Sequence, residues 1–197
     1  MIRIAIIIGS TRPGRACPSV ARWVHGIASA RADADYDILD IADYDLPHLD
    51  EPTPAAMGPH YVHEHTRKWS EAIDSYDGYI IVTPEYNHSI PGALKDAIDY
   101  LYTEWHNKAI GFVGYGLIGG TRAVEHLRGI AGELQLADVR AQVALSIFTD
   151  FENRTDPNPG PHHASTLTTM LDQLTQWSHA MQALRLGQLN TPAHSTN

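Results

Sequence analysis

The sequence predicts an α/β fold in which a five-stranded parallel sheet, with strand order 2-1-3-4-5, is doubly wound by helices on both faces. Apolar runs rich in β-branched residues alternate along the chain with segments of helical periodicity. Several runs are apolar throughout, as is typical of strands that are buried on both faces. Loops rich in glycine, proline and polar residues follow the first, third and fourth runs, where a fold of this kind binds its ligands.

The first half of the chain is expected to hold three strands and two helices. The strands are predicted at residues 2–8, 36–41 and 79–82, and the helices at 19–32 and 61–76. The second helix has Trp69 and Ile73 on its apolar side and ends before Asp77-Gly78. Residues 43–60, rich in proline and aspartate, are expected to form a loop at the outer wall of the binding cleft.

The second half continues the alternation. Helices are expected at residues 92–102, 121–134 and 165–184, and strands at 108–115 and 139–148. Pro91 suits the first turn of its helix, where a missing N–H costs nothing. Residues 1–186 are predicted to form one domain, and 187–197 a disordered tail.

The composition disfavours several partners and locations. Among 197 residues, 23 Asp and Glu outnumber 14 Lys and Arg, and the net charge is −9. An acidic chain is poorly suited to nucleic acids and to anionic membranes. The sequence shows no signal peptide and no apolar run long enough to cross a bilayer. Cys17 is the only cysteine, which excludes an intramolecular disulfide and favours the cytoplasm.

The first loop has the chemistry of a phosphate site. Ser10 lies between the first strand and the first helix, and Arg12 and Arg15 place two guanidinium groups within four residues. Gly9 and Gly14 allow a close backbone approach. The loop lacks the lysine and the following hydroxyl of a Walker motif, and the G-x-G-x-x-G fingerprint is also absent. The alternative is that this segment is only a turn between a strand and a helix.

The loop after the third strand suits a flat polar ring. Pro84, Glu85, Tyr86 and Asn87 combine turn formers with an aromatic ring, an amide and a carboxylate. The alternative is that the prolines only shape a turn and that Tyr86 is a packing residue. Beside a phosphate site, a planar ring with a polar edge indicates FMN.

Three segments together resemble the NADPH-dependent FMN reductase family, whose fold is flavodoxin-like. They are residues 9–15, residues 83–101, and Tyr115-Gly116 with residues 119–128, and the resemblance extends over about residues 3–150. The resemblance implies that Ser10, Arg12 and Arg15 hold the FMN phosphate. It also implies that Pro84, Glu85, Tyr86 and Asn87 border the isoalloxazine ring and that Tyr115 and Gly116 close the other side.

One residue departs from the family pattern. Cys17 stands where several members carry asparagine, so we expect its backbone N–H to take the place of a side-chain amide at the phosphate. The resemblance further implies an oligomer, a homodimer or homotetramer, in which subunits share the active cleft.

The resulting hypothesis is an oxidoreductase that holds FMN non-covalently, takes hydride from NADPH or NADH, and reduces a small-molecule electron acceptor such as free flavin or a quinone. We nominate no catalytic side chain, because the flavin carries out the chemistry. Two alternatives stay open at this stage. One is a flavodoxin-type electron carrier without substrate turnover, and the other is a quinone, azo-dye or metal-oxyanion reductase.

Several histidines and one thiol invite other interpretations. His60, His63 and His65 could bind a metal, but they lack a known ligand spacing, and solvated surface histidines explain them as well; the same holds for His162-His163. We therefore expect no metal. His88 could orient a nicotinamide or pack in its turn, and Cys17 could be a reactive thiol at a helix start.

Some positions on the helices also have two interpretations. Arg122 and Arg128 could contact a 2′-phosphate or be solvated helix residues. Tyr100 and Tyr102 lie off the apolar stripe formed by Leu94, Ile98 and Leu101, so we expect them to contact a partner subunit. Trp69 and Trp105 are expected to pack between helices, with a subunit interface as the alternative.

Overall fold

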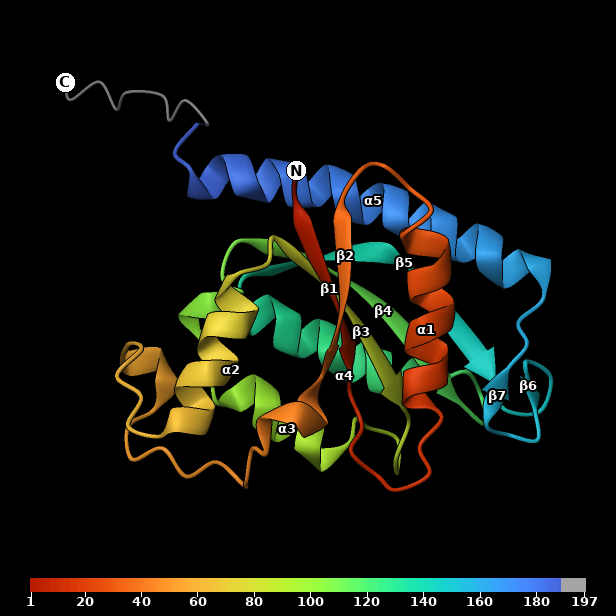
Figure 1. Ribbon diagram of the computed structural model, residues 1–197, viewed down its shortest axis with the longest axis horizontal. Coiled ribbons are helices and arrows are strands. Elements are labelled where there is room, and N and C mark those ends of the chain that lie inside the picture. The colour runs from red at the N-terminus through yellow and green to blue at the C-terminus, as the bar shows by residue number, and fades with distance from the viewer. Residues whose placement is uncertain (189–197) are drawn as a thin grey trace.

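The computed structural model describes residues 1–188 and contains one parallel sheet with the predicted strand order, β2-β1-β3-β4-β5 (Figure 1). The strands are β1 (Arg3–Ile8), β2 (Asp35–Asp40), β3 (Gly78–Pro84), β4 (Lys108–Gly116) and β5 (Leu136–Ser146). Every neighbouring pair is parallel. The predicted fold class is therefore confirmed. Most of the expected C-terminal tail, 189–197, lies outside the described residues.

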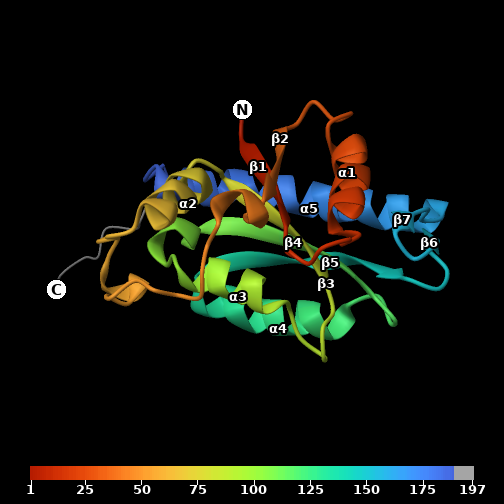
Figure 2. The ribbon, with the colours of Figure 1, turned by 60° about the horizontal axis from the view of Figure 1, so that its bottom comes forward.

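Helices cover both faces of the sheet, as Figures 1 and 2 show. On one face lie α1 (Cys17–Ala28) and α5 (Pro161–Arg185), and on the other lie α2 (Glu64–Asp74), α3 (Gly92–Asp99) and α4 (Thr121–Glu133). In β1, Ile4 and Ile6 point toward α1 and α5, whereas Ala5 and Ile7 point toward the other three helices. Successive side chains of a strand face opposite ways, so one apolar run supplies two cores.

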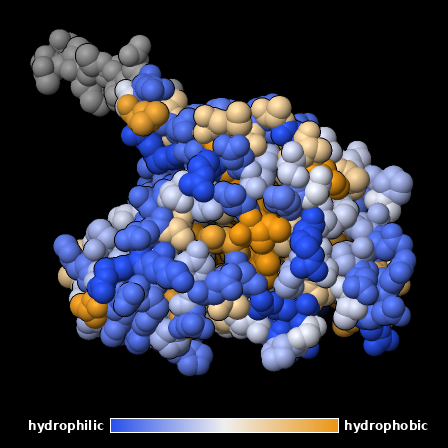
Figure 3. All heavy atoms as spheres, viewed as in Figure 1, coloured by the Kyte–Doolittle hydropathy of each residue, from blue (hydrophilic) through white to orange (hydrophobic). Residues whose placement is uncertain are grey.

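Strand β2 forms one edge of the sheet, because only β1 pairs with it. An unpaired edge can recruit another strand, and charged side chains oppose this. Asp35, Asp37 and Asp40 distribute negative charge along β2. Figure 3, drawn from the same side as Figure 1, shows apolar surface near the centre of this face, between α1 and α2, with polar surface around it.

Several expected helix boundaries are wrong, and the two largest differences are four residues each. The first helix begins at Cys17 and ends at Ala28, so it is shorter than predicted at its C-terminal end. The last helix begins at Pro161, four residues before its expected start, because proline fits the first turn of a helix. His162 and His163 therefore belong to this helix and not to a loop.

A short hairpin that was not predicted from the sequence lies between β5 and α5. Its strands, β6 (Phe151–Glu152) and β7 (Asp156–Pro157), pair antiparallel. Two-residue strands contain no periodicity that sequence analysis can detect. The hairpin brings residues 153–155 to the end of the sheet where the loops after β1, β3 and β4 also lie.

Of the aromatic residues considered above, the two tryptophans lie where they were expected and Tyr100 does not. Trp69 and Trp105 are buried in the core beneath α2 and α3, as expected. The prediction that Tyr100 contacts a partner subunit is wrong, because Tyr100 is fully buried and its hydroxyl donates to the Asp50 carboxylate at 2.8 Å. Tyr102 is partly buried, and its ring packs edge-on against His106.

Within residues 1–188, no helix combines the length and the apolar character that crossing a bilayer requires.

Candidate active site

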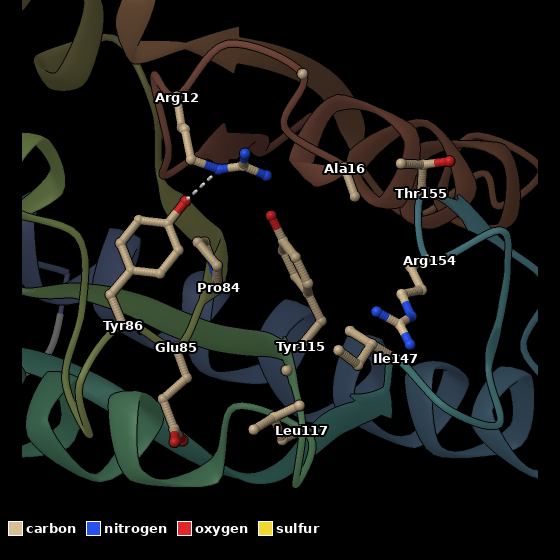
Figure 4. Close-up of a pocket in the computed structure, with 12 residues that line it drawn as sticks. Arg12, Ala16, Pro84, Glu85, Tyr86, Tyr115, Leu117, Ile147, Arg154 and Thr155 are labelled. Atoms are coloured by element: carbon tan, nitrogen blue, oxygen red, sulfur yellow. Dashed lines mark hydrogen bonds between the residues drawn. The ribbon is translucent and has the colours of Figure 1, made fainter.

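A cavity of about 230 Å³ lies at the carboxyl ends of β3 and β4, beside the loop that follows β1 (Figure 4). All three loops singled out in the sequence contribute to it. Its lining comprises Arg12, Gly14 and Ala16 from the first loop, Pro84, Glu85 and Tyr86 from the second, and Tyr115, Gly116 and Leu117 from the third. Doubly wound sheets bind ligands at the carboxyl ends of their strands, near the point where the strand order reverses.

Arg12 and Tyr86 join the first two loops. The Arg12 Nε donates to the Tyr86 hydroxyl at 3.3 Å, and the same hydroxyl shares a 3.2 Å hydrogen bond with the buried Ser10 Oγ. Gly9 lets the start of the first loop lie against β3, because a Cβ there would lie 2.8 Å from the Val82 carbonyl oxygen. Arg12 thus lines the cavity with its orientation fixed by the neighbouring loop.

Arg15 takes a different position from Arg12. Its Nη2 lies 2.5 Å from Asp40 Oδ2, an ion pair that is more than four-fifths buried on both sides. Arg15 is not among the residues that line the cavity. Asp40 also accepts the Ala42 N–H at 3.0 Å, so the pair fastens the first loop to the end of β2. Of the two arginines expected at the phosphate, only Arg12 lines the cavity.

Cys17 is fully buried at the start of α1. Its Sγ donates to the Val82 carbonyl at 3.1 Å, and burial raises the pKa of the thiol to about 12. A thiol with that pKa stays protonated and unreactive at neutral pH. The reactive-thiol interpretation is wrong, and Cys17 instead packs α1 against β3.

The second loop turns back on itself after Tyr86. Tyr86 and Ser89 exchange backbone hydrogen bonds of 2.9 and 3.0 Å, and Asn87 and His88 between them have φ of +50° and +67°. These are the left-handed values of a tight hairpin turn. Asn87 and His88 are exposed, and neither lines the cavity.

The Glu85 carboxylate points away from the cavity (Figure 4). It binds Arg122, whose Nε donates to Oε1 at 2.6 Å and whose backbone N–H donates to Oε2 at 3.0 Å. Burial acts to raise the pKa of Glu85, but the Arg122 hydrogen bonds outweigh it and hold the pKa below its usual value. Glu85 is thus an anchor between the second loop and α4.

The two arginines of α4 are both engaged within the chain. Arg122 contacts Glu85 and also His88, whose Nε2 lies 2.6 Å from its Nη1. Arg128 pairs with Asp138 and donates to Gln142 Oε1 at 2.9 Å. Neither is the freely solvated residue considered above, and neither side chain is available to a 2′-phosphate without losing these partners.

The third loop presents a tyrosine hydroxyl. Tyr115 is nearly buried, and Figure 4 shows its hydroxyl pointing into the cavity. Burial raises the pKa of Tyr115, so the group stays a neutral hydroxyl and can donate a hydrogen bond. Gly120, at φ +68°, lets the following turn lie against β4, where a Cβ would come within 2.6 Å of the Tyr115 nitrogen.

Ile147, Arg154 and Thr155 also line the cavity, and sequence analysis missed them. Arg154 lies at the tip of hairpin β6–β7, where it and Asn153 have φ of +61° and +51°. Asparagine tolerates this conformation, so Asn153 is the only sequence signal for the turn. Figure 4 shows Arg154 across the cavity from Arg12.

The lining combines groups that suit an anionic ligand with a flat ring. Arg12 and Arg154 supply positive charge, and Tyr86, Tyr115 and Thr155 supply hydroxyls. Pro84, Leu117 and Ile147 supply apolar surface. The cavity is smaller than the roughly 300–1,000 Å³ of a typical ligand pocket. A ligand as large as a flavin nucleotide would therefore extend beyond it onto the surrounding surface.

Two histidines at the start of α2 face an aspartate of the preceding loop. His63 and His65 stack with ring centroids 5.2 Å apart, and His65 Nε2 lies 3.1 Å from Asp50 Oδ1. His63 Nε2 lies 3.2 Å from the Asp50 carbonyl oxygen. These contacts secure the loop after β2 to the start of α2.

Comparison with known proteins gives consistent relatives. A sequence model of the NADPH-dependent FMN reductase family matches residues 2–150. The chain is 47% identical over 128 residues to the NAD(P)H-dependent FMN reductase of Nectria sp, a match that covers 62% of this chain and 64% of that protein, less than two thirds of it. It is 30% identical over 195 residues to the quinone reductase of Escherichia coli K12, covering 94% of this chain and 98% of that one.

A solved structure shares the fold. The flavoenzyme NAD(P)H:(acceptor) oxidoreductase FerB from Paracoccus denitrificans superposes with a TM-score of 0.72 at 20% identity, covering 92% of this chain and 99% of that one. At this identity the likeness shows the fold alone. The family match carries the assignment, because it covers most of the chain and contains all three predicted loops. The chain therefore belongs to the NADPH-dependent FMN reductase family.

Proposed function

We propose that this protein is an FMN-dependent oxidoreductase that takes hydride from NADPH or NADH and passes electrons to a small acceptor, a free flavin or a quinone. One observation carries the proposal. The family's three loops converge on a single cavity that has guanidinium groups on opposite sides and an apolar wall. Bound FMN supplies the hydride chemistry, and the protein binds and orients it.

The side chains around the cavity divide the work of holding FMN. Arg12, with Arg154 opposite, matches the phosphate, because a guanidinium stays charged and offers several N–H donors. Pro84, Tyr86 and Leu117 provide surface against which the flavin ring packs. Gly116 and the Tyr115 hydroxyl are proposed as further contacts to the flavin ring.

The remaining predicted site residues act on the cavity indirectly. Ser10 holds the Tyr86 hydroxyl, and Arg15 fastens the first loop through Asp40. Cys17 and Glu85 anchor the backbone at the two sides of the cavity. Asn87 lies in the exposed turn and would reach a ring only where the flavin extends beyond the cavity.

No side chain at the cavity is arranged as a general acid or base. Glu85 is the only carboxylate among the lining residues, and Arg122 binds it on the far side. Tyr115 keeps its proton at neutral pH, since its pKa is raised. The described part of the site is therefore suited to binding and orientation, which is what hydride transfer through a flavin requires.

We further propose that the protein works as a homodimer in the cytoplasm. Leu117, Ile118 and Phe148, on two loops beside the cavity, are 59%, 54% and 66% exposed. An apolar rim of this kind favours contact with another surface. A second copy could cover the part of FMN that the cavity leaves outside. Sedimentation equilibrium measures the assembly, and a monomer at micromolar concentration would contradict this part of the proposal.

The test of the function is a visible absorption spectrum of the protein with added FMN, followed by anaerobic NADPH or NADH. We expect a bound flavin whose absorption bleaches with either nucleotide and returns when a quinone is added. Bound flavin that neither nucleotide bleaches would favour an electron carrier. Failure to bind FMN would contradict the assignment of the cavity.

A further inference from the structure

Three potential metal ligands meet at the base of hairpin β6–β7, outside the cavity. They are Asp150, His162 and His163, and each offers a ligand atom within 4.8 Å of the other two. Asp150 Oδ1 lies 3.0 Å from His163 Nε2, and the two imidazole centroids are 3.8 Å apart. Nothing in the proposed flavin chemistry uses these groups.

The Asp150 carboxylate is already oriented for this arrangement. Its side chain is 9% exposed, and its Oδ2 accepts the Ser146 N–H at 2.8 Å. Its backbone carbonyl accepts the Asn158 N–H at 2.8 Å, which fixes the chain on the other side of the hairpin. Oδ1 faces His163. A ligand whose second oxygen is held by the protein loses little freedom when it binds a metal.

The two imidazoles lie in the first turn of α5, with ring centroids 3.8 Å apart, and His163 faces the Asp150 carboxylate. Asp150 therefore supplies a negative charge beside the two imidazole nitrogens, which favours a cation held between them.

We propose that Asp150, His162 and His163 form a binding site for a divalent transition-metal ion of the Zn²⁺ type. Two imidazole nitrogens and one carboxylate oxygen suit Zn²⁺, Ni²⁺ or Cu²⁺, whereas Mg²⁺ and Ca²⁺ prefer sets of oxygen ligands. His163 is 12% exposed but His162 is exposed, so solvent reaches the site and water can complete the coordination.

A metal ion at this location would affect the segment that lines one side of the cavity. Asp150 directly precedes β6 and the histidines begin α5, so a shared metal would join the two ends of the segment that carries Arg154 and Thr155. Closing a segment at its base restricts its motion. The metal would hold the hairpin tip over the cavity.

The test is calorimetric titration of untagged, chelator-treated protein with ZnCl₂, in the absence of FMN and nucleotides. We expect one specific equivalent of Zn²⁺, no displacement by equimolar Mg²⁺, and a rise in the thermal midpoint. The variant Asp150→Asn, which keeps a hydrogen-bond acceptor for Ser146, should bind at least tenfold more weakly. The double variant His162→Asn/His163→Gln should no longer bind this equivalent of Zn²⁺.

The matched control is His63→Gln/His65→Gln, which removes another pair of neighbouring imidazoles beside an aspartate. The control should still bind one equivalent of Zn²⁺. Circular dichroism should show that all variants are folded. Absence of stoichiometric Zn²⁺ binding, retention of it in the His162/His163 variant, or its loss in the control would each overturn the proposal. Because no flavin is present, these outcomes are independent of the proposed reductase activity.

Discussion

Arg12 and Arg15 are alike in the sequence, yet the fold gives them different tasks. Asp40 neutralises Arg15 in an ion pair that is largely buried, whereas the Arg12 guanidinium donates to the neutral Tyr86 hydroxyl and lines the cavity. An unneutralised guanidinium is the stronger attraction for a phosphate dianion. Of the two, Arg12 should dominate the affinity for FMN.

We expect Arg12→Ala to weaken FMN binding roughly ten- to a hundredfold, since a hydrogen bond to a charged group is worth about 1.5–3 kcal/mol. Titration of the apoprotein with FMN, followed by flavin fluorescence, measures the dissociation constant. The matched control is Arg22→Ala on the exposed side of α1, which should leave it unchanged. Equal affinity in wild type and Arg12→Ala would refute the phosphate assignment.

Residue types at the site were predictable, but their partners were not. The pattern of Gly9 to Arg15 indicates anion binding at a helix start. That Arg15 pairs with Asp40, and Glu85 with Arg122, depends on contacts between residues 25 and 37 positions apart. Local sequence contains no signal for such pairs, so it could not show which charged groups face the cavity.

Lys108, the first residue of β4, joins that strand to the end of α2. Its buried ammonium donates to the carbonyls of Ile73 and Asp74, both at 3.1 Å, and to the Tyr79 hydroxyl at 3.0 Å. The last carbonyls of a helix have no partner within it. Lys108 therefore caps α2 and holds it against the sheet.

Burial lowers the pKa of Lys108 from 10.5 to about 8. Between these values the unfolded chain keeps a proton that the folded protein has lost, so rising pH favours the folded state. We expect the stability of wild type relative to Lys108→Met to increase by about 2 kcal/mol from about pH 7.5 to 9.5. Urea unfolding of both proteins measures this difference, from which titrations that they share cancel. A difference that stays constant or falls with pH would show that burial does not shift this lysine.

Long elements were predictable and short ones were not. The five strands of the sheet have at least six residues each in the structure, and periodicity alone located them to within a few positions. The strands of hairpin β6–β7 have two residues each, which is too short to show a period. Arg154 and Thr155 were missed for this reason, although they line the cavity.

The family match ends at residue 150, but the core does not. Leu167, Met170, Leu171 and Leu174 of α5 are fully buried in the same core as Ile4 and other residues of β1 and β3. Burying each such side chain contributes about 1.5–3 kcal/mol, so the four contribute roughly 6–12 kcal/mol. This is comparable to the whole stability of a domain, about 5–15 kcal/mol.

We expect a fragment of residues 1–150 to aggregate or to lack a cooperative unfolding transition, because the sheet face beneath α5 would be exposed. Gel filtration and thermal unfolding followed by circular dichroism measure both properties. A fragment of residues 1–188 is the control and should match the full chain, in line with the prediction that the domain ends at 186. A monomeric, cooperatively folded 1–150 fragment would contradict the expectation.

Arg12 and Arg154 face each other across the cavity but are far apart in the chain. At about 5–20 residues per second, a ribosome makes Arg154 roughly 7–28 s after Arg12. A growing chain that already has the loops after β1, β3 and β4 still lacks the hairpin and α5, which covers one face of the sheet together with α1. A cavity with both guanidinium groups in place therefore forms only after the hairpin and α5 have been made.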